Sequence, residues 1–308
     1  MNTKKTFGQR LGRDMKMNWS LYMLMIPVVV YFIMFCYMPM YGIVMAFQDY
    51  SIFKGFSGSE WVGFEHFIKF FQSPRFGELL LNTIRISAAC LAFGFPAPVV
   101  LALLLNEIKS AKLGKVIQNC TYIPHFISLV VACSIIKIFT AETGVIGSFY
   151  NMITGSEAGN MLNNKNNFLP IYVISNIWQE CGWGSIIYLA ALSGIDQSLY
   201  EAAEVDGAGK WRKVISITLP SILPTVIIML IMRMGQILSV GYEKILLLGN
   251  DATSEVSDVL SVYNYEVGIK QSRYSYSSAI GLFNTLVNLL FVQAANWISR
   301  KVNGYALW

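Results

Sequence analysis

Long apolar runs separated by short polar segments constrain this chain more than any other feature. A helix needs about 20 mostly apolar residues to cross the hydrocarbon core of a bilayer. Six runs of this kind are present, centred on residues 21–47, 84–105, 116–139, 168–192, 214–238 and 279–298. The third and fifth are the weakest, because Lys137 and Arg233 interrupt them. The pattern predicts an all-α, polytopic membrane protein with six transmembrane helices.

The composition agrees with a surface that faces lipid. Charged residues make up 13% of the chain and hydrophobic residues 55%, whereas soluble domains carry about 25% charged residues. The net charge of +5 is spread over the segments between apolar runs, which excludes a nucleic-acid patch. The five cysteines lie in or beside apolar runs without metal-ligand spacing, so we expect small buried side chains and no metal site.

The basic residues predict how the chain is oriented. Lys and Arg are enriched in the cytoplasmic segments of membrane proteins, and with six spans the richest segments all fall on one side. We therefore expect a cytoplasmic N-terminal segment over residues 1–20, a transmembrane domain over residues 21–300 and a cytoplasmic C-terminus over residues 301–308. The residues concerned are Lys4, Lys5, Arg10, Arg13, Lys16, Lys109, Lys112, Lys115, Lys210, Arg212, Lys213, Arg300 and Lys301.

Two further features concern the shape of the bundle. Prolines inside the apolar runs predict bent helices around a watery cavity, since each proline removes a backbone donor; they are Pro96, Pro98, Pro124, Pro220 and Pro224. The first outer loop, over residues 50–71, is rich in aromatic residues. Its last part, residues 65–71, is either a helix at the level of the lipid headgroups or part of a docking surface for an external partner.

The segment over residues 196–220 carries the most specific pattern. Asp196 is a good N-cap and Gly207 a good helix stop, so we expect a helix of about ten residues, about 15 Å long, between them. Ala202 and Ala203 give this helix a smooth face. The basic residues from Lys210 onward then begin a second helix that enters the membrane. Such a helix either fits a groove on a partner or only connects two spans.

This segment is similar to the EAA signature of the permeases of binding-protein-dependent ABC importers. The matching positions are Glu201-Ala202-Ala203, Gly207, Ile217 and Leu219-Pro220. The resemblance implies the type I importer permease fold, with this loop as the cytoplasmic coupling helix that docks on an ATPase subunit. In that case Glu201 makes the polar contact, Ala202 and Ala203 form the packed face, and Gly207 makes the turn. Asp206, next to Gly207, belongs to the same predicted coupling set.

Other motifs resemble the polysaccharide branch of the sugar permeases. They include Pro39-Met40-Tyr41-Gly42, Pro124-His125-Phe126-Ile127-Ser128 and Gly281-Leu282-Phe283-Asn284. The resemblance implies import of oligosaccharides across a bacterial cell membrane. It also implies three kinds of partner: a second, homologous permease, a cytoplasmic ATPase dimer and an extracytoplasmic solute-binding lipoprotein.

A nucleotide-binding loop of the Walker A type is absent from the sequence. Gly207-Ala208-Gly209-Lys210-Trp211 lacks the upstream glycine and has Trp where Ser or Thr follows the lysine. No catalytic signature is present either. We therefore expect a transport subunit rather than an enzyme, with no cofactor bound by this chain, and with ATP and Mg²⁺ bound by the partner ATPase.

Polar and aromatic residues inside the apolar runs are the candidates for a substrate path. Sugars offer hydroxyls for hydrogen bonds and apolar faces for aromatic rings. The candidates are Trp178, Gln179, Glu180, Trp183, Arg233, Gln236 and Asn284. Alternative roles remain open: a tryptophan can pack in the core or against lipid, and Asn284 with Asn288 can form hydrogen bonds between helices.

Two other functional classes compete with an ATP-driven importer. A secondary sugar transporter coupled to an ion gradient needs membrane-embedded carboxylates and usually shows internal repeats, but Glu180 is the one strong acid inside the runs. A membrane-embedded enzyme needs convergent acids, a metal site or a nucleophile with a base, and the sequence shows none of these.

Overall fold

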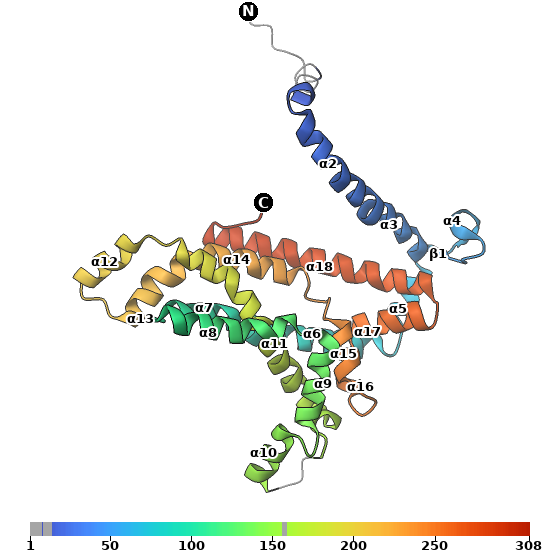
Figure 1. Ribbon diagram of the computed structural model, residues 1–308. Helices are drawn as coiled ribbons and strands as arrows, with labels where there is room; N and C mark the ends of the chain where they lie inside the picture. Colours follow the sequence, from blue (N-terminus) through green and yellow to red (C-terminus); the bar gives the residue numbers. More distant parts are fainter. Residues whose placement is uncertain (1–7, 9–13, 156–158) are drawn as a thin grey trace, which may run out of the picture.

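The computed structural model describes residues 8, 14–155 and 159–308, and almost all of its regular structure is helical (Figure 1). Within these ranges, five helices are long and apolar enough to cross a membrane: Trp19–Phe47, Phe76–Asn106, Leu129–Ile153, Lys210–Met234 and Tyr274–Val302. The all-helical prediction is confirmed, whereas the count of six spans and the domain boundaries stay predictions. The basic residues Lys4, Lys5, Arg10 and Arg13 lie outside the described residues.

The first apolar helix leads away from the rest of the molecule (Figure 1). It runs without interruption through α2 (Trp19–Phe32), η1 (Ile33–Tyr37), α3 (Met38–Met40) and η2 (Tyr41–Phe47). None of the residues in its most apolar stretch is buried within the chain. A helix that is apolar on every side requires lipid or another protein around it.

The aromatic segment that follows folds back onto the last helix. Strands β1 (Gln48–Asp49) and β2 (Glu60–Trp61) pair antiparallel on either side of α4 (Gly55–Gly58), and α5 (Glu65–Phe71) comes next. Phe70 is fully buried, and its ring packs edge-on against Phe283 of α18 (Tyr274–Asn303), with 5.5 Å between ring centroids. The predicted helix over residues 65–71 is confirmed, and its role stays a prediction.

The bundle is built around α11 (Lys165–Ser193), which lies against α7 (Pro96–Asn106). Val99, Tyr188 and Leu192 share a buried cluster with Ile222 of α14 (Leu219–Met234). Gly182 of α11 lies where α8 (Ala111–Tyr122) ends, and a Cβ atom there would sit 2.0 Å from the carbonyl oxygen of Thr121. Small residues allow such close approach of backbones in membrane bundles.

The predicted third span, residues 116–139, is wrong as a single helix. Helix α8 ends at Tyr122, a 3₁₀ turn (η4, Ile123–Phe126) follows, and α9 (Leu129–Thr140) starts afresh. Pro124 cannot donate a backbone hydrogen bond to a continuing helix. The hydroxyl of Ser128 caps the new helix by accepting from the backbone N–H of Val131 (3.4 Å). The apolar stretch that is long enough to span therefore begins at Leu129 and continues into α10 (Val145–Thr154).

The predicted fourth span, residues 168–192, lies within α11. This helix has 29 residues, enough to cross a bilayer at 1.5 Å per residue. It is not among the five helices that qualify by apolarity as well as by length. The reason is its polar content, since Asn176, Gln179 and Glu180 lie in its middle.

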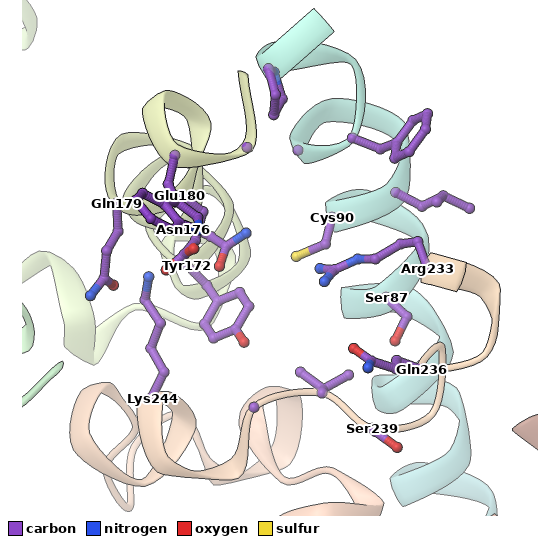
Figure 2. A pocket seen from close by; sticks show the side chains of 18 of the residues that line it. Ser87, Cys90, Tyr172, Asn176, Gln179, Glu180, Arg233, Gln236, Ser239 and Lys244 are labelled. Carbon is purple, nitrogen blue, oxygen red and sulfur yellow. The ribbon is translucent and has the colours of Figure 1, made fainter. Parts of the chain in front are cut away.

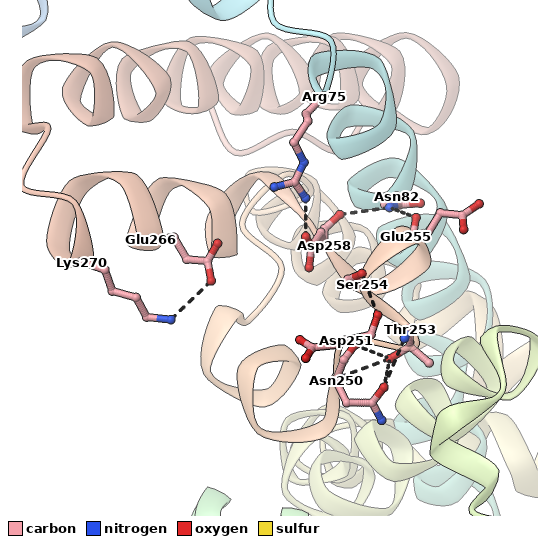
Figure 3. Close-up of polar contacts among 10 residues, drawn as sticks. All are labelled: Arg75, Asn82, Asn250, Asp251, Thr253, Ser254, Glu255, Asp258, Glu266 and Lys270. Carbon is pink, nitrogen blue, oxygen red and sulfur yellow. Dashed lines mark hydrogen bonds and ion pairs between the residues drawn. The ribbon is translucent and has the colours of Figure 1, made fainter.

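The segment between α14 and α18 is held in place by long-range polar contacts (Figure 3). The side-chain amide of Asn82 donates to the backbone carbonyls of Glu255 (2.8 Å) and Asp258 (3.1 Å), and Arg75 forms an ion pair with Asp258. These contacts fix the segment against α6 (Phe76–Ala89). The remaining elements are η3 (Cys90–Gly94), η5 (Met161–Asn163), α12 (Gln197–Val205), α13 (Lys210–Lys213), η6 (Val214–Thr218), α15 (Tyr242–Leu248), α16 (Ser254–Ser257), α17 (Leu260–Tyr265) and η7 (Glu266–Lys270).

Replacing Gly182 with Ala tests the close packing of α8 on α11. The added methyl group would collide with a backbone atom of Thr121, which cannot move aside like a flexible side chain. We expect a loss of about 1–3 kcal/mol in stability, measured as a lower midpoint of thermal unfolding in detergent. The control is Gly281→Ala in α18, where the nearest atom is a side-chain nitrogen 3.8 Å away. Equal midpoints for the two variants would contradict the packing described.

Candidate functional site

The loop predicted to couple the protein to a motor forms a short helix with defined ends. The side chain of Asp196 caps α12 by accepting from the backbone N–H of Ser198 (2.9 Å), and this hydrogen bond lowers the pKa of Asp196. At the other end Gly207 has φ of +73°, a conformation that residues with a side chain rarely adopt. The backbone N–H of Ala208 then bonds to the carbonyl of Ala203 (2.8 Å). The helix predicted between Asp196 and Gly207 is confirmed.

Helix α12 projects from one end of the bundle together with α13 (Figure 1). Glu201 and Ala202 are exposed, and Ala203 is half-buried. Two apolar side chains beside them are left in the open, since Val205 is 89% exposed and Trp211 is 81% exposed. Apolar groups gathered around a small-faced helix indicate a surface that another protein covers.

Two contacts hold α12 against the residues that follow it, and a third connects the loop to the bundle. The hydroxyl groups of Tyr200 and Thr218 are hydrogen-bonded at 2.9 Å. The ammonium group of Lys213 bonds to the carboxylate of Glu204 at 2.5 Å, which lowers the pKa of Glu204. Ile217 packs against the buried cluster between α7, α11 and α14.

The other residues of the predicted coupling set lie at the ends of their elements. Asp206 is exposed directly after α12, and Leu219 and Pro220 form the exposed first turn of α14. Pro220 lies inside the continuous helix Lys210–Met234, just after the π-helical turn Val214–Thr218, and it removes one backbone donor there. The roles of these residues, and of the rest of the coupling set, stay predictions.

A cavity of about 890 Å³ lies between α6, α11 and the segment that follows α14 (Figure 2), and its lining surface is mostly apolar with polar groups among it. It is large enough for a ligand of several rings. Its polar lining residues are Ser87, His125, Asn176, Gln179, Glu180, Arg233, Gln236, Ser239, Glu243 and Lys244, and its aromatic lining residues are Phe95, Tyr172, Trp183, Tyr188 and Tyr242.

Five of the seven predicted substrate-path residues line this cavity. Gln179, Glu180 and Trp183 come from α11, and Arg233 and Gln236 come from the end of α14 and the residues after it. The structure thus brings together two groups that are about 50 residues apart in the sequence. Their contact with a substrate stays a prediction.

The other two candidates do not line the cavity. Trp178 lies elsewhere on α11 and is 41% exposed. Asn284 donates to the backbone carbonyl of Leu238 (3.4 Å), and Asn288 accepts from the backbone N–H of Leu238 (3.0 Å). Both asparagines thus hydrogen-bond the segment that follows α14, and the role of Asn284 in a substrate path stays a prediction.

One wall of the cavity carries a stacked pair of rings. His125 of η4 lies flat against Trp183 of α11, with 4.7 Å between ring centroids and 3° between ring planes. The Nδ1 atom of His125 is 3.1 Å from a carboxylate oxygen of Glu180. Because the helix breaks at η4, His125 lies in the cavity wall, where it contacts both the ring of Trp183 and the carboxylate of Glu180.

Sequence reasoning missed several lining residues, above all Lys244, Asn176 and Tyr172. Lys244 lies between the fifth and sixth apolar runs, and candidates were sought only inside the runs. The run Ile245-Leu246-Leu247-Leu248 directly after it was the available signal that this segment is buried. Within the described residues, no three His, Cys, Asp or Glu side chains are grouped so that they could hold a metal ion.

Relatives of this chain are found over its whole length. Residues 94–304 match the family described as binding-protein-dependent transport system inner membrane component. In Bacillus subtilis (strain 168), Protein LplB is 44% identical over 97% of this chain and 92% of its own length. From the same organism, the polygalacturonan/rhamnogalacturonan transport system permease protein YteP is also 44% identical, over 97% of this chain and 93% of its own.

Two solved structures have the same fold. A chain of a bacterial ABC transporter involved in the import of the acidic polysaccharide alginate superposes with a TM-score of 0.87, at 41% identity, over 96% of this chain and 99% of its own length. A chain of a bacterial alginate ABC transporter in complex with an alginate pentasaccharide-bound periplasmic protein gives 0.88, at 40% identity, over 97% and 100%. The chain has the permease fold of ABC importers and belongs to the family of binding-protein-dependent transport system inner membrane components, as a multi-pass membrane component of a transporter.

Proposed function

We propose that this chain is the permease subunit of an ABC importer that moves oligosaccharides into the cytoplasm by ATP-driven alternating access. One observation carries the proposal: a capped helix, α12, projects from the end of a membrane bundle that contains a half-open cavity with polar and aromatic lining residues. The oligosaccharide and polysaccharide importers among the relatives support this substrate class. They give no support to the alternative of an ion-coupled transporter.

Helix α14 connects the two candidate sites. It begins directly after the loop, at Leu219, and ends at Met234, beside Arg233 in the cavity wall. Its 16 residues span about 24 Å at 1.5 Å per residue. Two residues of α12 are bonded to the helical residues just before α14. Tyr200 bonds to Thr218, and Glu204 bonds to Lys213. A displacement of α12 would therefore move the far end of α14 and reshape the cavity.

The energy would come from a separate ATPase dimer. The chain itself carries no Walker A loop, so ATP and Mg²⁺ are bound by that partner and this subunit binds no cofactor. Closure of the ATPase dimer would push on α12, with Glu201 as the polar contact and Ala202 and Ala203 as the packed face. Exposed Val205 and Trp211 would widen the docking surface.

The orientation follows from the basic residues. We place α12 and both termini in the cytoplasm of a bacterial cell, because the basic segments at Lys210–Lys213 and at Arg300 and Lys301 then obey the distribution typical of membrane proteins. A solute-binding lipoprotein would deliver the sugar from the other side. A second, homologous permease would complete the pathway and cover exposed apolar surface of this chain.

Replacing Gly207 with Val tests the coupling role of α12. Valine is strained at φ of +73°, so the helix would end differently and α12 would meet the ATPase at a changed angle. In proteoliposomes of the complete transporter, we expect the number of sugars imported per ATP hydrolysed to fall about tenfold or more. Uptake and phosphate release are measured on the same sample.

The control for this experiment is Gly209→Val. Gly209 has φ of −70° and ψ of 167°, which suit valine, and no atom would touch the added Cβ within 4 Å. We expect its coupling ratio to stay within about twofold of the wild type. A normal ratio in the Gly207 variant, or an equal loss in both, would contradict the proposal.

Replacing Trp183 with Ala tests the cavity as the sugar pathway. An aromatic side chain contributes about 0.5–1.5 kcal/mol beyond its burial, so we expect the apparent KM for uptake to rise about three- to tenfold. Trp178→Ala is the matched control, because Trp178 lies on the same helix outside the cavity. Equal changes in KM for the two variants would count against the cavity as the path.

A further inference from the structure

The cavity contains a buried cation with no hydrogen-bond partner. Lys244 is 5% exposed, and its Nζ atom makes no hydrogen bond within the described part of the chain. The nitrogen lies over the ring of Tyr172, 5.6 Å from the ring centroid. An ammonium group removed from water without a counter-charge is costly. An anion bound beside Lys244 would supply the missing counter-charge.

The chain holds this lysine firmly at the cavity wall. Its neighbours Ile245 and Leu248 are almost fully buried, in a cluster with Ile86 of α6 and Phe168 of α11. The hydrogen bonds from Asn82 to the following segment keep α15 against the bundle. Such a helix cannot easily turn its lysine out into solvent.

The carboxylates nearby leave the two cations of the cavity unpaired. Glu180 is bound to His125, and Glu243, next in sequence to Lys244, is exposed. Among residues 8, 14–155 and 159–308, no carboxylate oxygen lies within 4.0 Å of the basic nitrogens of Lys244 or Arg233. Neither cation is therefore neutralised by an ion pair with a carboxylate of these residues.

The two cations face the cavity from different walls. In Figure 2, Lys244 points up from α15 beside Tyr172, whereas Arg233 points in from the opposite side, towards Asn176. A ligand that spans this space would meet an ammonium group, a guanidinium group and amide side chains. Trp183 and Tyr242 add aromatic surface to the same lining.

We propose that Lys244, assisted by Arg233, is an anion subsite of the transport cavity, and that the imported oligosaccharides carry uronic-acid carboxylates. The inference rests on the proposed function and specifies its substrate. A uronosyl residue combines the three features that this wall matches: a carboxylate for the cations, hydroxyls for amides and an apolar ring face for aromatic side chains. A neutral sugar would leave Lys244 buried without a counter-charge.

The test compares acids with their esters on the assembled transporter without its binding protein. The probes are trigalacturonate, an alginate trisaccharide and their fully methyl-esterified forms, with binding measured by equilibrium dialysis at low salt, where screening is weak. For the wild type, we expect at least one acid to bind about tenfold or more tighter than its own ester, since hydrogen bonds to charged groups are strong. In Lys244→Met this preference should fall to within about twofold.

Two further variants serve as controls. Lys244→Arg keeps the positive charge, and we expect it to retain most of the preference for the acid. Lys270→Met removes a cation that is exposed and paired with Glu266 outside the cavity, and we expect the wild-type preference. Size-exclusion profiles of all variants report whether the complex is still assembled.

Three outcomes would overturn the inference: equal binding of both acids and their esters by the wild type, no binding of any of the four, or a preference that persists in Lys244→Met. A different experimental result would refute the proposed function. It is refuted by an unchanged ratio of sugar imported to ATP hydrolysed in Gly207→Val, which does not depend on the charge of the sugar.

Discussion

Backbone groups inside a bilayer must find partners within the protein, and the structure meets this constraint at the cavity. Helix α14 ends at Met234, and the chain then runs irregularly up to α15. Side chains from two other helices form hydrogen bonds with backbone groups of this stretch. Ser87 of α6 donates to the carbonyl of Ile237, and Asn288 of α18 accepts from the N–H of Leu238. Irregular backbone is tolerated at this depth only where protein surrounds it or water reaches it.

The same constraint explains where the other helices break. The π-helical turn Cys90–Gly94 and the 3₁₀ turn Ile123–Phe126 both contribute residues to the cavity lining. Breaks of this kind occur often at functional sites, because they turn side chains and backbone groups towards a ligand. The cavity is thus the place where three departures from regular helix meet, and Lys244 and Arg233 flank the last of them.

Local signals in the sequence were sufficient for the loop at the end of the bundle. Asp196 caps α12 and Gly207 ends it through contacts within a few residues, so their identities alone predicted the helix. The prediction of the third span as one helix was wrong because a run of apolar residues does not by itself show where a helix breaks. Pro124 and Ser128 are the residues that mark the break. Helix α11 is less apolar than the others because Asn176, Gln179 and Glu180 face the cavity, and hydropathy cannot distinguish such a lining from a weak span.

Lys244 could not be placed from the sequence for a different reason. Its burial depends on Asn82, which lies 173 residues away from the Glu255 carbonyl that it binds, and on packing against α6 and α11. Pairings over such distances are set by the whole fold, so the apolar run over residues 245–248 could indicate burial but not where the lysine lies. Arg233 and Gln236 were recognised because a charged residue inside an apolar run is conspicuous.

The first helix has a consequence for how this subunit is made and maintained. The most apolar stretch of Trp19–Phe47 has no residue buried against the rest of its own chain, so lipid or a companion subunit must surround it. A companion subunit that packed against this helix would stabilise the folded chain, because anything that binds only the folded state shifts the equilibrium towards it. The stability of this subunit would then depend on the presence of its companion.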